Sequence, residues 1–246
     1  MLLNIDRLGK RFDGFAAVDG VDLAVAPGTI HSVIGPNGAG KTTFFRLLTG
    51  ILRPTQGTVI FDGHDITGLR PHAVTRRGLT QSFQITTVFP RMTVIESVQV
   101  AILARRRRSW DFATTRQGTL EQEALGLLDQ VGLRELAAIQ AQTLSHGDQR
   151  ILEVALALAT QPRLLLLDEP TAGMSPFETD RMVRLVTGLA RERGLTVLLS
   201  EHDMDVVFGI SDEVTVLHQG QVIAHGSPGQ VQDDEQVVEV YLGGEA

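Results

Sequence analysis

The sequence predicts an α/β fold in which crossover helices join the strands of a mostly parallel sheet. Strand-like apolar runs alternate with helical segments along the 246 residues, which is the pattern typical of such folds. The run "RLLLLDEP" contains four consecutive leucines, Leu164–Leu167, as expected for a strand buried on both faces. No repeat, low-complexity stretch or linker interrupts the chain, so we expect a single domain over residues 1–246.

The first third of the chain carries strand, helix and turn signals in close succession. Short β-rich runs open it and include "TIHSVIG" at Thr29–Gly35. The segment "GKTTFFRLLTG" then predicts a helix that stops at Gly50, because glycine tolerates the left-handed backbone that ends a helix. The stretch "GTVIFDGHDI" alternates like a strand, and its Asp62-Gly63 pair predicts a tight turn.

The rest of the chain predicts a helical insert followed by further strands and helices. Residues 93–136 are helix-rich, and we expect an inserted helical region over approximately residues 85–160. The segment "SPFETDRMVRLVTGLARERG" predicts a helix with Ser175 as N-cap and Glu178 completing a capping box. "LTVLLSEH" predicts another buried strand and "VTVLHQGQVIAHG" a hairpin, and Ser227 begins a capped terminal helix.

Composition and charge exclude several classes of protein. The formal net charge of −7 argues against a general nucleic-acid binder. The chain has no cysteine, which excludes disulfides and thiolate metal sites. Its most apolar stretch, residues 154–167, is interrupted by Gln161, Pro162 and Arg163 and falls short of the roughly 18 apolar residues of a spanning helix. We therefore expect a chain that does not itself cross a membrane.

The glycine-rich segment "GPNGAGKT" predicts a phosphate-binding loop, or P-loop. It follows a predicted strand, opens a predicted helix and matches G-x-x-x-x-G-K-[ST]. Glycines let the backbone approach phosphate closely, and the helix start adds a partial positive charge. Lys41 would reach the β- and γ-phosphates, and Thr42 would ligate magnesium. The residues expected to contact the nucleotide here are Gly35, Pro36, Asn37, Gly38, Ala39, Gly40, Lys41, Thr42 and Thr43.

The leucine-rich strand supplies the carboxylates that such a loop needs. Asp168 ends the strand, where open α/β sheets place their ligands, and is expected to hold magnesium directly or through water. Glu169 follows and can act as the general base that polarises the attacking water. The pair predicts an enzyme that binds and hydrolyses a nucleoside triphosphate.

The order of "GPNGAGKT", "SFQ", "LSHGDQR", "LLLLDEP" and "SEHD" resembles the ATP-binding subunits of ATP-binding cassette (ABC) transporters over nearly the whole chain. The resemblance implies a P-loop NTPase (RecA-like) core, an antiparallel β subdomain and an inserted α-helical subdomain. It also implies that the signature "LSHGDQR" of a second subunit closes the site, with Ser145 and Gly147 capping the γ-phosphate. His146 and Asp148 depart from the family's Leu-Ser-Gly-Gly-Gln, and Ser175 replaces a common aspartate.

The same resemblance assigns further roles to residues outside these motifs. Gln84 matches the glutamine that touches magnesium and the attacking water, and His202 matches the histidine that contacts the γ-phosphate. Phe12 matches the aromatic residue that stacks on adenine, although a core role and Phe15 both compete with this assignment, and Val18 is expected to pack against the base. The arginines at 105–108 are either a solvated helix end or a patch that faces phospholipid head groups or an acidic partner.

The branch of the family that the sequence resembles most is the importers of branched-chain amino acids. "TAGMSP", "SEHDM" and the tail "VYLGGEA" carry this likeness. It implies ATP and Mg²⁺ as cofactors, with a second ATPase subunit, identical or different, and membrane permeases as partners. It further implies a periplasmic solute-binding protein and a peripheral position at the cytoplasmic face of the inner membrane. Urea or amide uptake, lipopolysaccharide export, a non-transport ABC ATPase and a small-molecule kinase are the alternatives.

Overall fold

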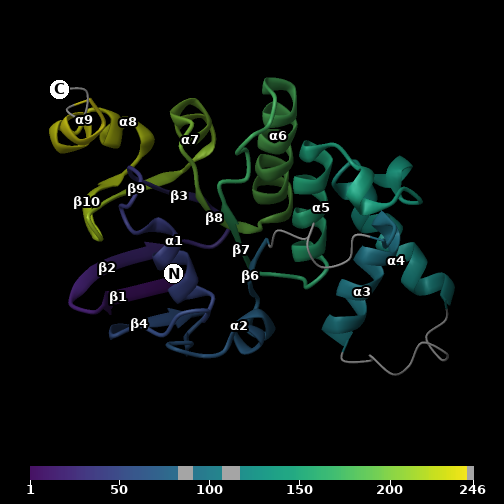
Figure 1. Ribbon diagram of the computed structural model, residues 1–246, viewed down its shortest axis with the longest axis horizontal. Coiled ribbons are helices and arrows are strands. Elements are labelled where there is room, and N and C mark those ends of the chain that lie inside the picture. The colour runs from purple at the N-terminus through teal and green to yellow at the C-terminus, as the bar shows by residue number, and fades with distance from the viewer. Residues whose placement is uncertain (83–90, 107–116, 243–246) are drawn as a thin grey trace.

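The computed structural model describes residues 1–82, 91–106 and 117–242 (Figure 1). The strands are β1 (Leu3–Phe12), β2 (Phe15–Val25), β3 (Ile30–Ile34), β4 (Gln56–Phe61), β5 (His64–Asp65), β6 (Leu79–Gln81), β7 (Leu164–Asp168), β8 (Thr196–Ser200), β9 (Glu213–His218) and β10 (Gln221–Gly226). The helices are α1 (Lys41–Leu48), α2 (Pro71–Arg77), α3 (Val94–Arg106), α4 (Gln117–Gln130), α5 (His146–Leu158), α6 (Pro176–Arg193), α7 (Met204–Ile210), α8 (Pro228–Gln232) and α9 (Glu235–Leu242), with short 3₁₀ turns η2 (Arg134–Leu136) and η3 (Ala141–Thr143).

Within the described residues, the strands form two sheets that confirm the predicted fold class. The larger sheet has the order β10-β9-β3-β8-β7-β6, and all its pairings are parallel except that of β9 with β10. The smaller sheet, β2-β1-β4-β5, is antiparallel throughout. Helix α1 lies between the two sheets and α2 packs into the same core, whereas α5 and α6 cover the opposite face of the larger sheet (Figure 1).

The leucine-rich strand β7 explains how the two layers are held together. Leu164 and Leu166 point into the core that α1 shares with the smaller sheet. Leu165 and Leu167 point into the opposite core, beneath α5 and α6. All four are fully buried, and burying each leucine is worth about 1.5–3 kcal/mol. Strand β7 therefore anchors both faces and holds its carboxyl end, with Asp168, in a fixed place.

Helices α3, α4 and α5 lie between β6 and β7 in the chain and share the core of the larger sheet. Arg105 and Arg106, at the end of α3, both pair with Glu123 of α4, and the Arg105–Glu123 distance is 2.7 Å. Arg105 also donates to the Ala159 carbonyl at 3.1 Å. These two arginines therefore join helices within the insert and do not form a free basic patch; Arg107 and Arg108 lie outside the described residues.

The structure confirms the predicted helix cap, helix-ending glycine and hairpin turn, but the sequence did not predict two short helices. Ser175 forms the predicted capping box with Glu178, and Gly50 has the left-handed backbone, with φ 73°, expected beyond the end of α1. Asp62 and Gly63 turn the chain between β4 and β5 with positive φ angles, as the hairpin signal predicts. Helices α2 and α7 were not predicted, because seven residues are too few to display a helical period. No helix in the described parts of the chain is long and apolar enough to span a bilayer.

Candidate active site

The glycine-rich loop joins β3 to α1 and has a backbone that only glycine can adopt at two points. Gly35 and Gly40 have φ angles of 152° and 106°. A Cβ atom would lie 2.1 Å from the Leu217 carbonyl at Gly35 and 2.4 Å from the Ala17 carbonyl at Gly40. The Gly220 amide also donates to the Ala39 carbonyl at 2.9 Å. The loop is thus packed against two neighbouring strands, and its shape is set before any phosphate binds.

The other predicted loop residues differ in their access to solvent. Ala39 is buried and donates its N–H to the Pro36 carbonyl at 3.1 Å, which tightens the loop. Asn37, Gly38 and Thr42 are exposed, and Thr43 is half-buried at the start of α1. No acidic residue stands in the first turn of α1 to compete for the free backbone amides. The loop therefore offers a concave set of N–H donors suited to an oxyanion.

Lys41 places a nearly buried ammonium group beside this loop. Its Nζ donates to the Gly35 carbonyl at 2.5 Å and to the Pro36 carbonyl at 3.3 Å, and the residue is 7% exposed. Burial lowers the pKa of Lys41, and the nearby carboxylates of Glu169 and Asp168 oppose that shift. The cation therefore lies in the electrostatic field of both carboxylates, although it belongs to a different strand–loop–helix unit.

The two carboxylates at the end of β7 are positioned by Ser200, the last residue of the adjacent strand β8. The Ser200 hydroxyl donates to Asp168 Oδ1 at 2.6 Å. The Glu169 amide donates to the Ser200 carbonyl at 3.1 Å and approaches its hydroxyl at 3.2 Å. Glu169 has a φ angle of 51°, a conformation that costs a non-glycine residue about 1 kcal/mol or more. These hydrogen bonds hold Glu169 in that conformation and turn its side chain out of the strand direction.

His202 meets the Glu169 side chain directly. Its Nε2 lies 2.6 Å from Glu169 Oε1, although the two residues are 33 positions apart in the sequence. Strands β7 and β8 pair in parallel, so the loops that follow them leave the sheet at the same edge. The carboxylate and the imidazole can therefore act on one proton-transfer step.

Thr42 and Asp168 line one cavity of about 330 Å³, together with Gln81 and Ser82. A hydroxyl and a carboxylate oxygen fit Mg²⁺, which typically binds through one or two carboxylates and the phosphates of its substrate. No set of three or more His, Asp or Glu residues in the described ranges is arranged to hold a metal alone. Gln84, the further predicted magnesium contact, lies outside the described residues.

The signature stretch begins helix α5, and its last residue, Arg150, belongs to the lining of that cavity. Ser145 is the N-cap of α5, and its hydroxyl accepts from the Asp148 amide at 3.1 Å. Ser145 is exposed, whereas Gly147 is buried and donates its N–H to Glu178 Oε1 at 3.1 Å. Neither residue belongs to the lining of the Thr42–Asp168 cavity. Their predicted contact with a phosphate held by another molecule stays a prediction.

The structure explains two of the departures from the family pattern. Asp148 accepts from Arg181 Nη1 at 2.6 Å, and Arg181 also donates to the Gly132 carbonyl at 2.8 Å, so that α5, α6 and the turn after α4 are joined. Ser175 caps α6 through Glu178. Hydrogen bonds from Ser175, and a further one from Gly147, hold the pKa of Glu178 below its usual value. His146 is exposed, and nothing in the described contacts accounts for its identity.

Of the residues expected to contact a base, the phenylalanines are exposed and the valine is buried. Phe12 and Phe15 face each other in the register at the tip of the β1–β2 hairpin and are 43% and 69% exposed. The competing interpretation of Phe12 as a core residue is therefore wrong. Lys10 Nζ lies 5.1 Å from the centre of the Phe12 ring. Val18, at 1% exposure, packs in the core and presents almost no surface to a base, so Phe12 remains the better candidate for stacking.

Sequence reasoning missed the polar residues that end strand β8. Ser200 is fully buried and Glu201 is 3% exposed. Glu201 Oε1 accepts from both the amide and the hydroxyl of Thr171, at 2.9 and 2.5 Å. The available signal was the change from a buried apolar run to Ser-Glu directly before His202, since a polar pair in that position requires partners.

Known proteins are similar to this chain over nearly its whole length. A family model described as "ABC transporter" matches residues 18–172, and one described as "Branched-chain amino acid ATP-binding cassette transporter" matches residues 221–246. The high-affinity branched-chain amino acid transport ATP-binding proteins BraF of Pseudomonas aeruginosa and LivG of Escherichia coli K12 are 42% and 40% identical, with 98% of each chain covered. The lipopolysaccharide export system ATP-binding protein LptB of Haemophilus influenzae is 34% identical, over 98% of this chain and 97% of LptB.

The fold is likewise similar to solved structures. The ADP conformation of MJ1267, an ATP-binding cassette of an ABC transporter, superposes with a TM-score of 0.88 at 31% identity, and 98% of each chain is covered. A nucleotide-free ATP-binding cassette from an ABC transporter gives a TM-score of 0.87 at 30% identity, again over 98% of each chain.

Proposed function

The chain belongs to the ABC transporter family of ATP-binding cassettes, and from that premise we propose that it energises the uptake of branched-chain amino acids by hydrolysing ATP at the site around Lys41 and Glu169. The observation that carries the hydrolytic assignment is the contact between Glu169 Oε1 and His202 Nε2, at 2.6 Å, beside the phosphate loop. A carboxylate in hydrogen-bond contact with an imidazole at the edge of a parallel sheet is suited to accept a proton from water. ATP turnover by the purified chain, measured with and without Mg²⁺, tests the assignment.

Each residue of the site has a distinct part in the reaction. The amides of the glycine-rich loop and the Lys41 ammonium bind the phosphates and stabilise the charge that develops on the γ-phosphate. Thr42 and Asp168 would hold Mg²⁺, which when bound supplies positive charge to the β- and γ-phosphates. Glu169 takes the proton of the attacking water, and His202 orients that carboxylate through the Nε2–Oε1 contact.

We further propose that the working unit contains two cassettes. Ser145 is exposed at the start of α5 and lies outside the cavity lined by Thr42 and Asp168, so its free surface is available to a phosphate held by another chain. Gly147 would join it once its N–H is released from Glu178. The second cassette is a copy of this chain or a related chain. In either arrangement Ser145 would contact a phosphate that the other cassette holds.

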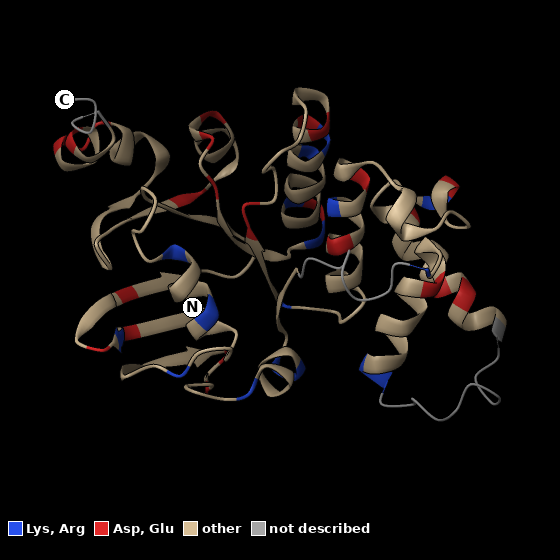
Figure 2. Ribbon diagram, viewed as in Figure 1, with Lys and Arg blue, Asp and Glu red and all other residues tan. Residues whose placement is uncertain are grey.

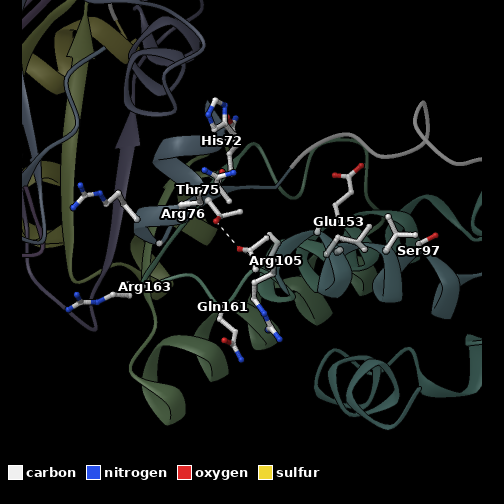
Figure 3. A pocket seen from close by; sticks show the side chains of 18 residues that line it. His72, Thr75, Arg76, Ser97, Arg105, Glu153, Gln161 and Arg163 are labelled. Carbon is white, nitrogen blue, oxygen red and sulfur yellow. Dashed lines mark hydrogen bonds between the residues drawn. The ribbon is translucent and has the colours of Figure 1, made fainter. Parts of the chain in front are cut away.

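A groove of about 810 Å³ suits the permease that such a cassette must drive. It lies between α2 and the insert helices α3 and α5: His72, Thr75 and Arg76 lie on one side, and Ser97, Arg105 and Glu153 on the other (Figure 3). Val100, Ala101, Ala104, Leu156 and Ala157 add apolar surface. Arg76 and Arg77 add positive charge on the α2 side (Figure 2), which favours a helical segment of the permease with an acidic side chain.

Reversal of charge in this groove is expected to separate transport from ATP hydrolysis. Arg76 is exposed on α2 and lies outside the Thr42–Asp168 cavity. We expect Arg76→Glu to lower transport by about tenfold, since like-charge contacts across an interface cost on the order of 1 kcal/mol or more, while turnover by the isolated chain stays within about twofold. Arg184→Glu, on the exposed side of α6, is the matched control. Equal loss of transport in both variants would contradict the docking assignment.

The solute can be tested in cells. In an Escherichia coli K12 strain that lacks LivG, this chain is expected to restore leucine uptake, and its Glu169→Gln variant is not. Uptake of urea and of amides is measured in the same strain, to test the alternative solutes. Hydrolysis of ATP without recovery of leucine uptake would refute the solute assignment alone. In this proposal the chain lies peripherally at the cytoplasmic face of the membrane, and a periplasmic solute-binding protein supplies the amino acid.

A further inference from the structure

Glu201 is a buried carboxylate whose position in the fold has no role in the mechanism above. It follows the last residue of β8, is 3% exposed, and directly precedes His202. No Lys, Arg or His side chain of the described residues forms an ion pair with it. A buried carboxylate without a cation is costly unless hydrogen bonds satisfy its oxygens, so the contacts of Glu201 must compensate for its burial.

Those contacts come from two different loops. Oε1 accepts from the Thr171 amide at 2.9 Å and from the Thr171 hydroxyl at 2.5 Å. Oε2 accepts from the backbone amide of His202 at 3.1 Å. Thr171 belongs to the loop between β7 and α6, two residues after Glu169, and His202 belongs to the loop between β8 and α7. One carboxylate therefore ties together the loop that carries the base and the loop that carries its imidazole partner.

We propose that Glu201 is a positioning residue for ATP hydrolysis, which holds His202 against Glu169 by fixing both loops at once. The inference rests on the proposed hydrolytic role of Glu169. The Glu169–His202 contact spans 2.6 Å, and Glu201 restrains the backbone on each side of it. Displacement of a reacting group by about 1 Å can cost on the order of 100-fold in rate, so this restraint bears directly on turnover.

The hydrogen-bond pattern also explains why a carboxylate is needed. The three hydrogen-bonding groups that contact Glu201 in the described part of the chain are all donors, and together they engage both of its oxygens. A glutamine would present one oxygen and one NH₂ group, and the NH₂ would face a donor on either Thr171 or His202. Glu201→Gln therefore keeps the size of the side chain but releases one of the two loops.

The hydroxyl of Thr171 offers a matched pair of variants. Thr171→Val removes the donor and keeps the side-chain shape, whereas Thr171→Ser keeps both donors to Glu201. We expect Thr171→Val to lower kcat about tenfold with KM for ATP within about twofold, and Thr171→Ser to stay near the wild-type kcat. Glu201→Gln should lower kcat at least as far, and adding Thr171→Val to it should change kcat by less than about twofold more.

Amide hydrogen exchange without nucleotide gives a readout that does not depend on turnover. Thr171→Val should speed exchange in residues 169–175 and at His202 about tenfold relative to Thr171→Ser. Unchanged exchange would overturn the inference whatever the activity. So would a lowered Tm in Thr171→Val and Glu201→Gln with wild-type kcat, because the cluster would then support only the fold. If the wild-type chain fails to hydrolyse ATP, the proposed function fails instead, and the exchange comparison still decides whether Glu201 couples the loops.

Discussion

Glu169→Gln is expected to slow ATP hydrolysis by about 10²- to 10⁴-fold, the range that general acid–base catalysis contributes. Glutamine has nearly the same shape as glutamate but cannot accept the proton of the attacking water. The amide of residue 169 still donates to Ser200, so the backbone geometry at this position is retained. ATP binding depends on Lys41 and the glycine-rich loop, which this change leaves intact. The variant should therefore bind ATP and hold it.

Because bound ATP is no longer consumed, the variant should accumulate as an ATP-bound dimer. Sedimentation with ATP should show a shift to about twice the monomer mass, and single-turnover measurements should show the loss of the chemical step. Glu192→Gln, on the exposed end of α6, removes the same charge and serves as the control. A Glu169→Gln protein with full turnover would remove Glu169 from the role of base, although family membership would stand.

Lys41→Ala is expected to weaken ATP binding by about 10- to 150-fold, which corresponds to the roughly 1.5–3 kcal/mol of a hydrogen bond to a charged group. Lys41 is nearly buried beside the loop, and its ammonium group would exchange the carbonyls of Gly35 and Pro36 for phosphate oxygens. Alanine removes this cation, which lies in the electrostatic field of Glu169 and Asp168, and the loop loses its only side-chain charge.

Calorimetric titration with ATP measures this loss directly. Arg184→Ala, which removes a positive charge from the exposed face of α6, should leave the Kd within about twofold. If Lys41→Ala bound ATP as tightly as the wild type and lost only kcat, Lys41 would act in the transition state alone. The two variants thus separate binding from chemistry. Glu169→Gln is expected to lower turnover, and Lys41→Ala is expected to lower the affinity for ATP.

Much of the fold and of the candidate site could be predicted because the signals are local. Four consecutive leucines between Pro162 and Pro170 predict a short, doubly buried strand, and β7 has its two faces in separate cores. The Ser175–Glu178 capping box and the N-cap at Ser145 each depend on residues three positions apart. The glycine-rich loop requires positive φ angles that few other residues accept, so its conformation follows from its composition.

Other parts of the site depend on contacts between distant segments, which periodicity and spacing do not report. Phe12 could be a core or a surface residue until the β1–β2 hairpin placed it at an exposed tip. In the sequence, Asp148 is only a departure from the family's signature. The structure gives it a partner, because Arg181 of α6 lies beside it. Glu201 had no visible role before Thr171, 30 residues earlier, supplied its donors.

The division between these two groups has a simple physical reason. Caps, glycine-dependent turns and continuous apolar runs are stabilised by a residue's own neighbours in the chain, so the amino-acid order already contains them. The Glu169–His202 contact and the two loops tied by Glu201 exist only because β7 and β8 lie side by side with their carboxyl ends at one edge. Parallel pairing joins segments that are far apart in the chain, and only the packed sheet brings the base, its histidine and the buried carboxylate together.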